Sequence, residues 1–192
     1  MIKTDHFDKV EITTQEELRL WLLKHYTQKE SVWLVTYKKN EPRKYVSREE
    51  VLDELLCFGW VDGIRRKLDD SKTMQLISPR KVAHWTRTYK ERAERLIAHK
   101  RMHESGLKAI EASKERGLWN FMDDVDNLIV PDDLIAELSK FEGATDFFNA
   151  INASSKRFVL RWIKLAKTAT TRQNRIKKVA VLSAKKEKLP GS

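Results

Sequence analysis

The sequence predicts an α+β protein in which a small sheet packed with helices is followed by an all-helical C-terminal unit. Capping boxes mark helices in the N-terminal third, β-branched and aromatic runs mark strands, and only helical periodicity continues beyond Trp85. The irregular order of helices and strands favours α+β over a parallel α/β sheet. We predict a mixed domain over residues 1–118, a helical unit over residues 131–192 and an ordered connection over residues 119–130.

Two capping boxes predict helices on either side of the first strand. Residues 14–17 place a hydroxyl at the N-cap and a carboxylate three positions later, which predicts a helix over about residues 15–26. Residues 47–50 repeat the pattern, and Gly59 is placed to end this second helix. Cys57 lies on the apolar side of the second helix, so we expect a buried structural thiol.

Strand signals lie between and after these helices. Residues 32–37 are β-branched and aromatic, which is typical of a strand. Residues 64–68 and 73–77 predict the two strands of a hairpin, because residues 69–71 between them favour a turn.

Helical spacing predicts the rest of the chain. Amphipathic helices are expected over residues 88–102 and 105–116, and the first would place His99 and His103 on one face. Beyond Pro131 a short helix is expected over residues 145–151. The expected N-caps of the other helices there are Asp132 or Asp133, Ser154 and Thr171. The helix after Ser154 presents Phe158, Trp162 and Leu165 as its apolar stripe, and we predict that Trp60, Trp85 and Trp162 are mostly buried.

Composition excludes several classes of protein. The chain has 192 residues, 41% of them hydrophobic and six of them Trp, which predicts a packed core and excludes wholesale disorder. One cysteine excludes an intramolecular disulfide framework and a Cys-rich zinc site. No apolar run approaches the roughly 18 residues of a membrane span, and residues 1–10 lack the apolar stretch of a signal peptide. We therefore expect a cytoplasmic protein.

The net charge of +10 is concentrated at the C-terminal end. Residues 153–192 hold 12 of the 38 basic residues and one of the 28 acidic residues, which leaves the first 152 residues close to neutral. Helical spacing gathers some of these cations on one face, as expected for a surface that binds nucleic acid or another acidic partner. The candidate residues are Arg161, Lys164, Arg172 and Arg175. The alternative is an ordinary solvated face with some cations docked on the acidic residues 123–126.

A second candidate site lies around the turn that ends at Gly63. Three cations follow this turn, and Arg80 and Trp85 come shortly after the predicted hairpin. Arginines beside a carboxylate and tryptophans can line a site for a phosphate or carboxylate ligand. The candidate residues are Trp60, Asp62, Arg65, Arg66, Arg80 and Trp85. The alternative is structural, with Asp62 capping the turn, Trp60 and Trp85 in the core and the arginines solvated or paired.

Specific catalytic signals are missing from the sequence. It has no Gly-rich phosphate loop and no nucleophile elbow, and we name no catalytic residue and no cofactor. His99 and His103 have a spacing that suits a metal, but no third ligand is evident, so we predict no metal site. Whether the protein is an enzyme stays open, and a role without catalysis is favoured.

Several segments of the sequence carry family-like motifs. In the N-terminal part they are residues 31–35, 57–63 and 78–80 with Trp85, and in the C-terminal part residues 162–167 and 171–176. With these segments the chain resembles the YdeI/OmpD-associated family, also labelled bacteriocin-protection proteins. The chain departs from the family pattern at Leu76, Ile77, Thr86 and Tyr89. The resemblance provides no established enzymatic activity to carry over to this chain, and the family label implies protection against cationic peptides or association with a porin.

Two functions follow from these observations. The first is a binding or interaction protein without catalysis, whose basic C-terminal helical face meets an acidic partner. The second is a protein that binds a small anionic ligand, or a weak enzyme, with a pocket of arginine, aspartate and tryptophan. The sequence does not specify the partner, the ligand or the oligomeric state.

Overall fold

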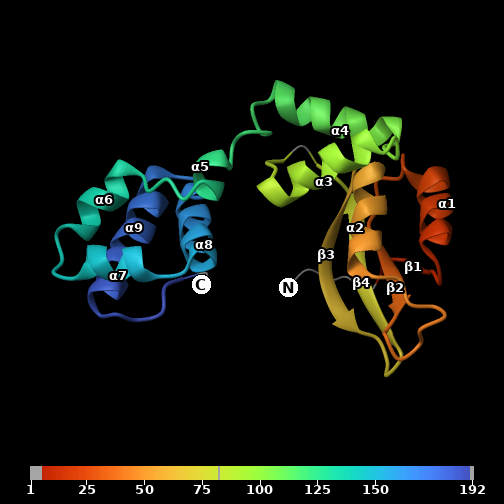
Figure 1. Ribbon diagram of the computed structural model, residues 1–192, viewed down its shortest axis with the longest axis horizontal. Coiled ribbons are helices and arrows are strands. Elements are labelled where there is room, and N and C mark those ends of the chain that lie inside the picture. Colours follow the sequence, from red (N-terminus) through yellow and green to blue (C-terminus); the bar gives the residue numbers. More distant parts are fainter. Residues whose placement is uncertain (1–5, 82, 191–192) are drawn as a thin grey trace. The chain divides into compact units, whose positions relative to one another are not determined.

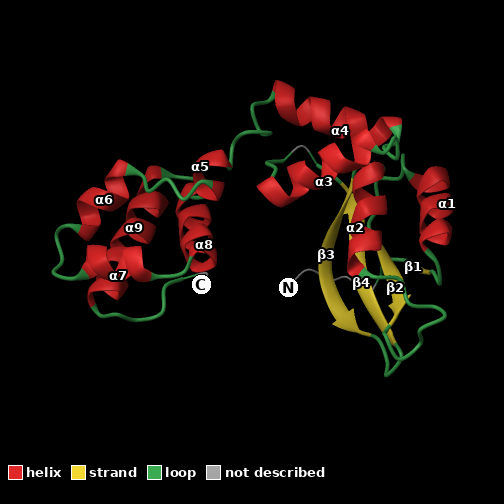
Figure 2. Ribbon diagram, viewed as in Figure 1, coloured by secondary structure: helices red, strands yellow, loops and turns green. Residues whose placement is uncertain are grey.

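The computed structural model describes residues 6–81 and 83–190, and the chain divides into two compact units (Figure 1). Unit 1 is Met1–Asn120 and unit 2 is Phe121–Ser192. All strands of the described residues lie in unit 1, whereas the described part of unit 2 consists of helices and loops (Figure 2). The predicted α+β class is confirmed.

Unit 1 contains a mixed four-stranded sheet with the strand order β1-β2-β4-β3. The strands are β1 (Lys9–Glu11), β2 (Val32–Tyr37), β3 (Trp60–Lys67) and β4 (Lys72–Pro79). β1 pairs parallel with β2, whereas β4 pairs antiparallel with both β2 and β3. The predicted strand and hairpin are present, and β1 is too short for its alternation to be recognised in the sequence.

The first two helices of unit 1 begin where the capping boxes predict. They are α1 (Gln15–His25) and α2 (Arg48–Cys57). The Thr14 hydroxyl accepts a hydrogen bond from the first turn of α1, and Ser47 and Glu50 form a reciprocal capping box at α2. These side chains satisfy backbone N–H groups that a helix start leaves without a partner.

The region of His99 and His103 differs from the prediction. Two further helices complete unit 1, α3 (Arg87–Ala98) and α4 (Glu104–Glu115). α3 stops short of Met102 because His99 is its C-cap and Lys100 adopts a left-handed conformation with φ of 55°. His103 is the N-cap of α4, and its ring Nδ1 accepts from the Ser105 backbone N–H at 3.2 Å. The two histidines belong to different helix ends, so the prediction that they share one helix face is wrong.

The core of unit 1 lies between the sheet and its first two helices. Val32, Leu34 and Ile77 share one face of the sheet and are buried with apolar residues of α1 and α2. The helical residues of this core include Leu18, Leu22, Val51 and Leu55. Further along, the same face of the sheet becomes polar, since Thr36 of β2 pairs with Thr73 of β4. This change from apolar to polar residues determines where a polar site can form.

The segment that joins α2 to β3 is a structural connection. Its carbonyl oxygens accept hydrogen bonds from His103 N to Cys57 (3.0 Å), Ser105 Oγ to Phe58 (2.9 Å) and Arg80 N to Gly59 (2.8 Å). A Cβ on Gly106 would lie 2.3 Å from the Cys57 carbonyl oxygen, so α4 approaches this segment as closely as a glycine allows. Cys57 is buried, as predicted, and burial raises the pKa of its thiol to about 11.

Unit 2 is a helical bundle with its own apolar core. Its helices are α5 (Asp123–Asp126), α6 (Asp132–Leu138), α7 (Ala144–Ala150), α8 (Ala153–Lys164) and α9 (Ala169–Ala184). Met122 and Val125 are buried in the same core as Leu134 and Val179. Residues 121–130 therefore contribute to the core of this unit.

The helix starts of unit 2 differ from the prediction by a few residues. Pro131 is the N-cap of α6, and Asp132 and Asp133 lie in its first turn. The side chain of Asn152, not Ser154, caps α8, and that of Thr168, not Thr171, caps α9. Each of these two side chains accepts a backbone N–H three residues later, so an earlier polar residue takes the cap.

The buried stripe of α8 is also different. Val159, Leu160 and Ile163 are buried, whereas Phe158 is 51% exposed and Leu165 is 38% exposed. Trp162 is partly buried and packs against the core of unit 2, which agrees with the prediction that it is mostly buried. The predictions for Trp60 and Trp85 are confirmed, since each is 1% exposed.

Candidate functional site

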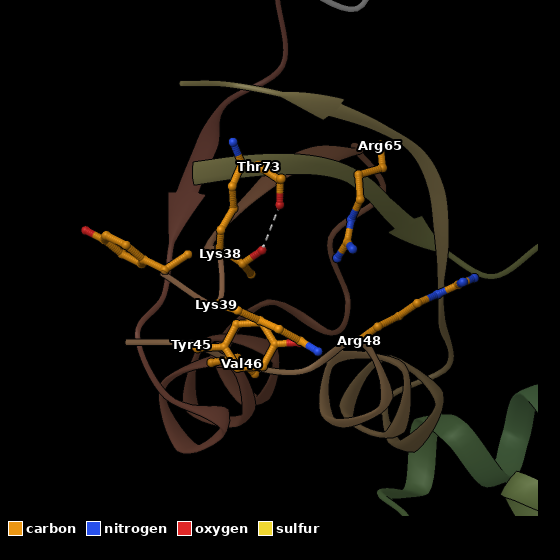
Figure 3. Close-up of a pocket in the computed structure, with 9 residues that line it drawn as sticks. Lys38, Lys39, Tyr45, Val46, Arg48, Arg65 and Thr73 are labelled. Atoms are coloured by element: carbon orange, nitrogen blue, oxygen red, sulfur yellow. Dashed lines mark hydrogen bonds between the residues drawn. The ribbon is translucent and has the colours of Figure 1, made fainter. Parts of the chain in front are cut away.

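The candidate site is a pocket of about 220 Å³ in unit 1, at the end of the sheet where the helix-facing side becomes polar (Figure 3). Thr36 and Thr73 form its floor, and their hydroxyl oxygens lie 3.3 Å apart. Tyr45 and Val46, which precede α2, also line it. The pocket is therefore built from two strands of the sheet and the loop that leads into α2.

Strand register places Arg65 at this pocket. Residues directly opposite each other on antiparallel strands point to the same face. Asp62 pairs with Ile77 and Arg65 pairs with Gln75, although a regular strand would place Asp62 and Arg65 on opposite faces. An irregularity of β3 between these two residues brings both onto the helix-facing side.

Cations dominate the pocket, and none of its lining residues is acidic. The Lys38 ammonium group donates to the backbone carbonyls of Asp69 (2.7 Å) and Asp70 (3.2 Å), so its charge is used locally. In Figure 3 the Arg65 guanidinium instead points toward the space beside the Thr73 hydroxyl, and the Lys39 side chain runs past the Tyr45 ring and ends on the other side of the pocket. This arrangement offers two cations to a ligand.

Arg48 forms the edge of the pocket nearest to β3. Its Nη2 lies 3.9 Å from Asp62 Oδ2, and its side chain is 65% exposed. So exposed a pair at that distance contributes little energy, and the guanidinium stays available to a ligand. A guanidinium fork, an ammonium and two hydroxyls are the groups with which proteins bind phosphate or carboxylate.

The six predicted ligand residues do not converge on one cavity. Arg65 lines the pocket described above, whereas the neighbouring Arg66 lies on the opposite face of the sheet, 5.3 Å from the centre of the Trp33 ring. Trp60 packs edge-on against Trp21 with ring centres 5.6 Å apart, and both belong to the core cluster of unit 1. Trp60 is therefore structural.

Asp62, Arg80 and Trp85 do form a connected group, and Tyr89 links them. Tyr89 donates a 2.6 Å hydrogen bond to Asp62 Oδ1, and Gln75 Nε2 donates to Oδ2 at 3.0 Å. Burial, together with the bond to Asp62, raises the pKa of Tyr89 to about 12. The Arg80 guanidinium lies 3.9 Å from the centre of the Trp85 ring and 5.6 Å from that of Tyr89. Asp62 thus accepts its hydrogen bonds from neighbours other than the predicted arginines.

The sequence did not identify Thr36, Lys39, Arg48 and Thr73 as site residues. The only hint in the sequence was that Thr36 and Thr73 each lie near one end of a predicted strand. Their pairing depends on the register between β2 and β4, which no local pattern specifies.

The predicted cations of unit 2 contact groups of the same unit. Arg172 binds Asp133 with two hydrogen bonds of 2.7 and 2.9 Å, and Lys164 lies 2.5 Å from Asp124. The bond from Arg172 holds the pKa of Asp133 below its usual value. Burial alone would raise the pKa of Asp124, but the bond from Lys164 brings it below its usual value.

Of the remaining two predicted cations of unit 2, Arg175 contacts a group of the same unit. Arg175 donates to the carbonyl oxygen of Trp162, and its guanidinium lies 4.9 Å from the centre of the Trp162 ring. Arg161 is exposed and takes part in an interaction of its own. Together with Lys164 and Arg172, these contacts show that part of the basic surface stabilises unit 2.

Metal and membrane sites have no counterpart in the described residues. Residues 6–81 and 83–190 contain no group of three or more His, Cys, Asp or Glu placed to hold a metal ion. No helix in these same ranges is long and apolar enough to cross a membrane.

Two family models match the chain. Residues 10–109 match the family described as Domain of unknown function (DUF8412), and residues 127–186 match the family described as Bacteriocin-protection, YdeI or OmpD-Associated. The second match confirms the resemblance for the C-terminal segments, whereas the N-terminal segments fall within the first match. No curated protein and no solved structure matches the chain. Because the first match spans more than half of the 192 residues, the chain belongs to the DUF8412 family, and its C-terminal part is of the YdeI/OmpD-associated type.

Proposed function

We propose that this protein binds a small molecule through a phosphate or carboxylate group in the pocket of unit 1. The observation that carries the proposal is that the Arg65 guanidinium points into a pocket that Lys39 also lines and that has no acidic lining residue. The hydroxyls of Thr36 and Thr73 add polar groups at its floor. The proposal concerns binding and includes no chemical reaction.

Physical chemistry favours an anion as the occupant. Two cations that line the same pocket repel each other, and an anion between them removes that repulsion. A threonine hydroxyl can donate to an anionic oxygen while accepting from a neighbour, so the Thr36–Thr73 pair can reorganise around a ligand. The volume of about 220 Å³ suits a small anionic group rather than a polymer.

An acidic partner at the basic face of unit 2 has less support. Lys164, Arg172 and Arg175 already donate to groups of unit 2. A polyanion that used them would have to compete with these intramolecular acceptors. Among the described residues, the side chains of Arg65 and Lys39 form no hydrogen bond or ion pair, so an anion in the pocket of unit 1 meets no such competition.

Isothermal titration calorimetry of the full chain with inorganic phosphate tests the proposal. Arg65→Gln removes the guanidinium that points into the pocket, and the matched control is Arg66→Gln, one residue along on the opposite face of the sheet. A hydrogen bond to a charged group is worth about 1.5–3 kcal/mol, so we expect Arg65→Gln to weaken binding about tenfold or more.

The control variant gives the experiment its contrast. We expect Arg66→Gln to bind phosphate within about twofold of the parent, because both variants lose the same charge and differ only in the face affected. Equal losses in the two variants would mean that only net charge matters. That result, or the absence of any phosphate binding at low salt, would contradict the proposal.

A further inference from the structure

We infer that unit 1 has a second binding site for a small oxyanion, built around Arg80 at the opposite end of the same two strands. A cavity of about 410 Å³ lies there, and Arg80 is one of its lining residues. Its walls include Ser31, directly before β2, and Ser78, near the end of β4. The first pocket lies at the other end of these strands, near Thr36 and Thr73.

The guanidinium of Arg80 is held in a fixed position. One face lies on the Trp85 ring at 3.9 Å, and Nη2 donates to the His84 carbonyl oxygen at 3.1 Å. The backbone N–H of Arg80 donates to the Gly59 carbonyl at 2.8 Å, so the main chain is fixed as well. A fixed guanidinium loses little conformational entropy when it binds a ligand.

The same guanidinium lacks an anionic partner among the described residues. Its Nε is buried without an acceptor, and none of the described carboxylates forms an ion pair with it. Asp62, the acidic residue of the adjacent group, accepts from Tyr89 and Gln75 instead. Buried donors are normally satisfied, and burial of the unpaired charge lowers the pKa of Arg80. A bound oxyanion in the cavity would supply the missing counter-charge.

The other lining residues suit a small organic anion. Lys29 and Lys81 are exposed cations that reach the cavity from two segments, and no lining residue is acidic. Ser31 and Ser78 offer hydroxyls, while Val61, Pro79 and Ala83 provide apolar surface. Polar groups that converge within a partly apolar wall are typical of small-molecule sites. The ligand class is a carboxylate or phosphate on a small body.

The test follows the Arg80 Nε–H signal in ¹⁵N–¹H NMR spectra of the full chain. Inorganic phosphate and succinate are titrated separately, so that the phosphate and carboxylate alternatives are distinguished. We expect a saturable shift of the Arg80 signal with at least one of the two anions. A double variant, Lys29→Gln with Lys81→Gln, changes only exposed residues and should weaken this binding about threefold to tenfold.

Variants at Arg80 and Arg65 separate this site from the first pocket. Arg80→Lys keeps the charge but removes the fork, and calorimetry should show a loss of about tenfold or more for the anion that shifts the signal. A melting curve shows whether the Arg80→Lys variant is folded. If it is not folded, the variant with Lys29→Gln and Lys81→Gln provides the test. Arg65→Gln should leave the Arg80 shift unchanged.

Three results would overturn the inference. They are no saturable shift at millimolar anion, a shift that the double lysine variant leaves intact, and a shift that Arg65→Gln abolishes. The last result would place the ligand in the first pocket and would leave the proposed function standing.

Discussion

Both units carry an excess of cations, but they use it differently. Unit 1 has 25 basic and 19 acidic residues, and unit 2 has 13 and 9. In unit 2, Lys164, Arg172 and Arg175 donate to groups of the unit itself. In unit 1, Arg65 and Lys39 line a pocket without acidic lining residues. Whether a cation is available to a ligand therefore depends more on the acceptors around it than on the net charge of its segment.

The contrast also explains why the C-terminal segment looks more like a binding surface in the sequence than in the structure. Residues 153–192 contain a single acidic residue, yet the partners of their cations lie earlier in the same unit. Asp124 and Asp133 belong to α5 and α6 and reach Lys164 and Arg172 across the bundle. Charge counted along a segment omits partners that the fold brings close.

Unit 1 also uses many of its arginines internally. The buried Asp53 accepts from Arg92 and Arg95, and the fully buried Glu54 accepts from Arg19 and Arg101. These ion pairs join α2 to α1, to α3 and to the segment before α4. The two candidate sites are lined by other cations, Arg65 and Lys39 at one end of the sheet and Arg80, Lys29 and Lys81 at the other.

Replacement of a buried tryptophan by alanine should change the free energy of unfolding most. Trp60→Ala should reduce the free energy of unfolding of unit 1 by about 3–5 kcal/mol, because the side chain is buried in the core. Trp162→Ala should reduce that of unit 2 by less than half as much, because the ring is half-buried. Residue-resolved amide hydrogen exchange reports each unit separately, and equal losses would contradict the difference in burial.

Removal of a buried carboxylate should have the next largest effect. Glu54→Gln leaves Arg19 and Arg101 without their counter-charge in a buried site, and we expect a loss of about 3 kcal/mol in unit 1. Asp133→Asn breaks a half-exposed pair with Arg172 and should remove less than about 1 kcal/mol from unit 2. Urea unfolding of both variants checks this order, and a larger loss for Asp133→Asn would reverse the comparison.

The basic face of unit 2 should prove to be structural. Arg161→Ala, Arg172→Ala and Arg175→Ala together should lower the stability of unit 2 by about 1–3 kcal/mol, since hydrogen bonds of about 0.5–1.5 kcal/mol each are lost. Filter binding to mixed nucleic acid at two salt concentrations should be no weaker than for a control that loses the same charge. The control substitutes three exposed lysines of the same unit, Lys167, Lys177 and Lys178, by alanine.

A stable triple variant that loses nucleic-acid binding, while the lysine control retains it, would instead support a polyanion site on this face. The affinity of such a site would fall steeply with salt, because each contact releases condensed counterions.

The smallest effect is the dependence of the stability of unit 2 on acidic pH that its ion pairs Lys164–Asp124 and Arg172–Asp133 create. The pKa of Asp133 and that of Asp124 lie below their usual value in the folded state, so each contributes stability above the ordinary value of 3.8. This contribution is lost as the pH falls through the lowered pKa of the folded state. Both pairs are partly exposed, so each loss should stay under about 1 kcal/mol. If Asp133→Asn leaves the acid limb of the stability profile of unit 2 unchanged, the assignment to this pair is wrong.

The sequence predicts where helices begin better than it predicts which side of a helix is buried. The capping boxes at Thr14 and Ser47 locate α1 and α2, because a side chain that satisfies a free N–H is a local signal. The buried face of α8 is not local, since Phe158 and Trp162 have the same helical spacing as the stripe that is buried. Which stripe is buried depends on the helices that pack against it.

The candidate sites depend even more on tertiary structure. Arg65 and Arg80 were predicted as ligand residues of one pocket, and the structure places them at two different cavities. The first arrangement requires the register between Thr36 and Thr73 and the irregularity after Asp62. Neither has a signature within a short window of sequence, so residue types could be predicted and their grouping could not.

The most direct test of the contrast between the units is a residue-resolved NMR titration of the full chain with inorganic phosphate at low salt. We expect saturable shifts in unit 1, at Thr36, Thr73 and the Arg65 side chain, and no saturable shift at the Arg172 side chain of unit 2. Saturable shifts at Arg172 and its neighbours, with Arg65 unaffected, would contradict this contrast.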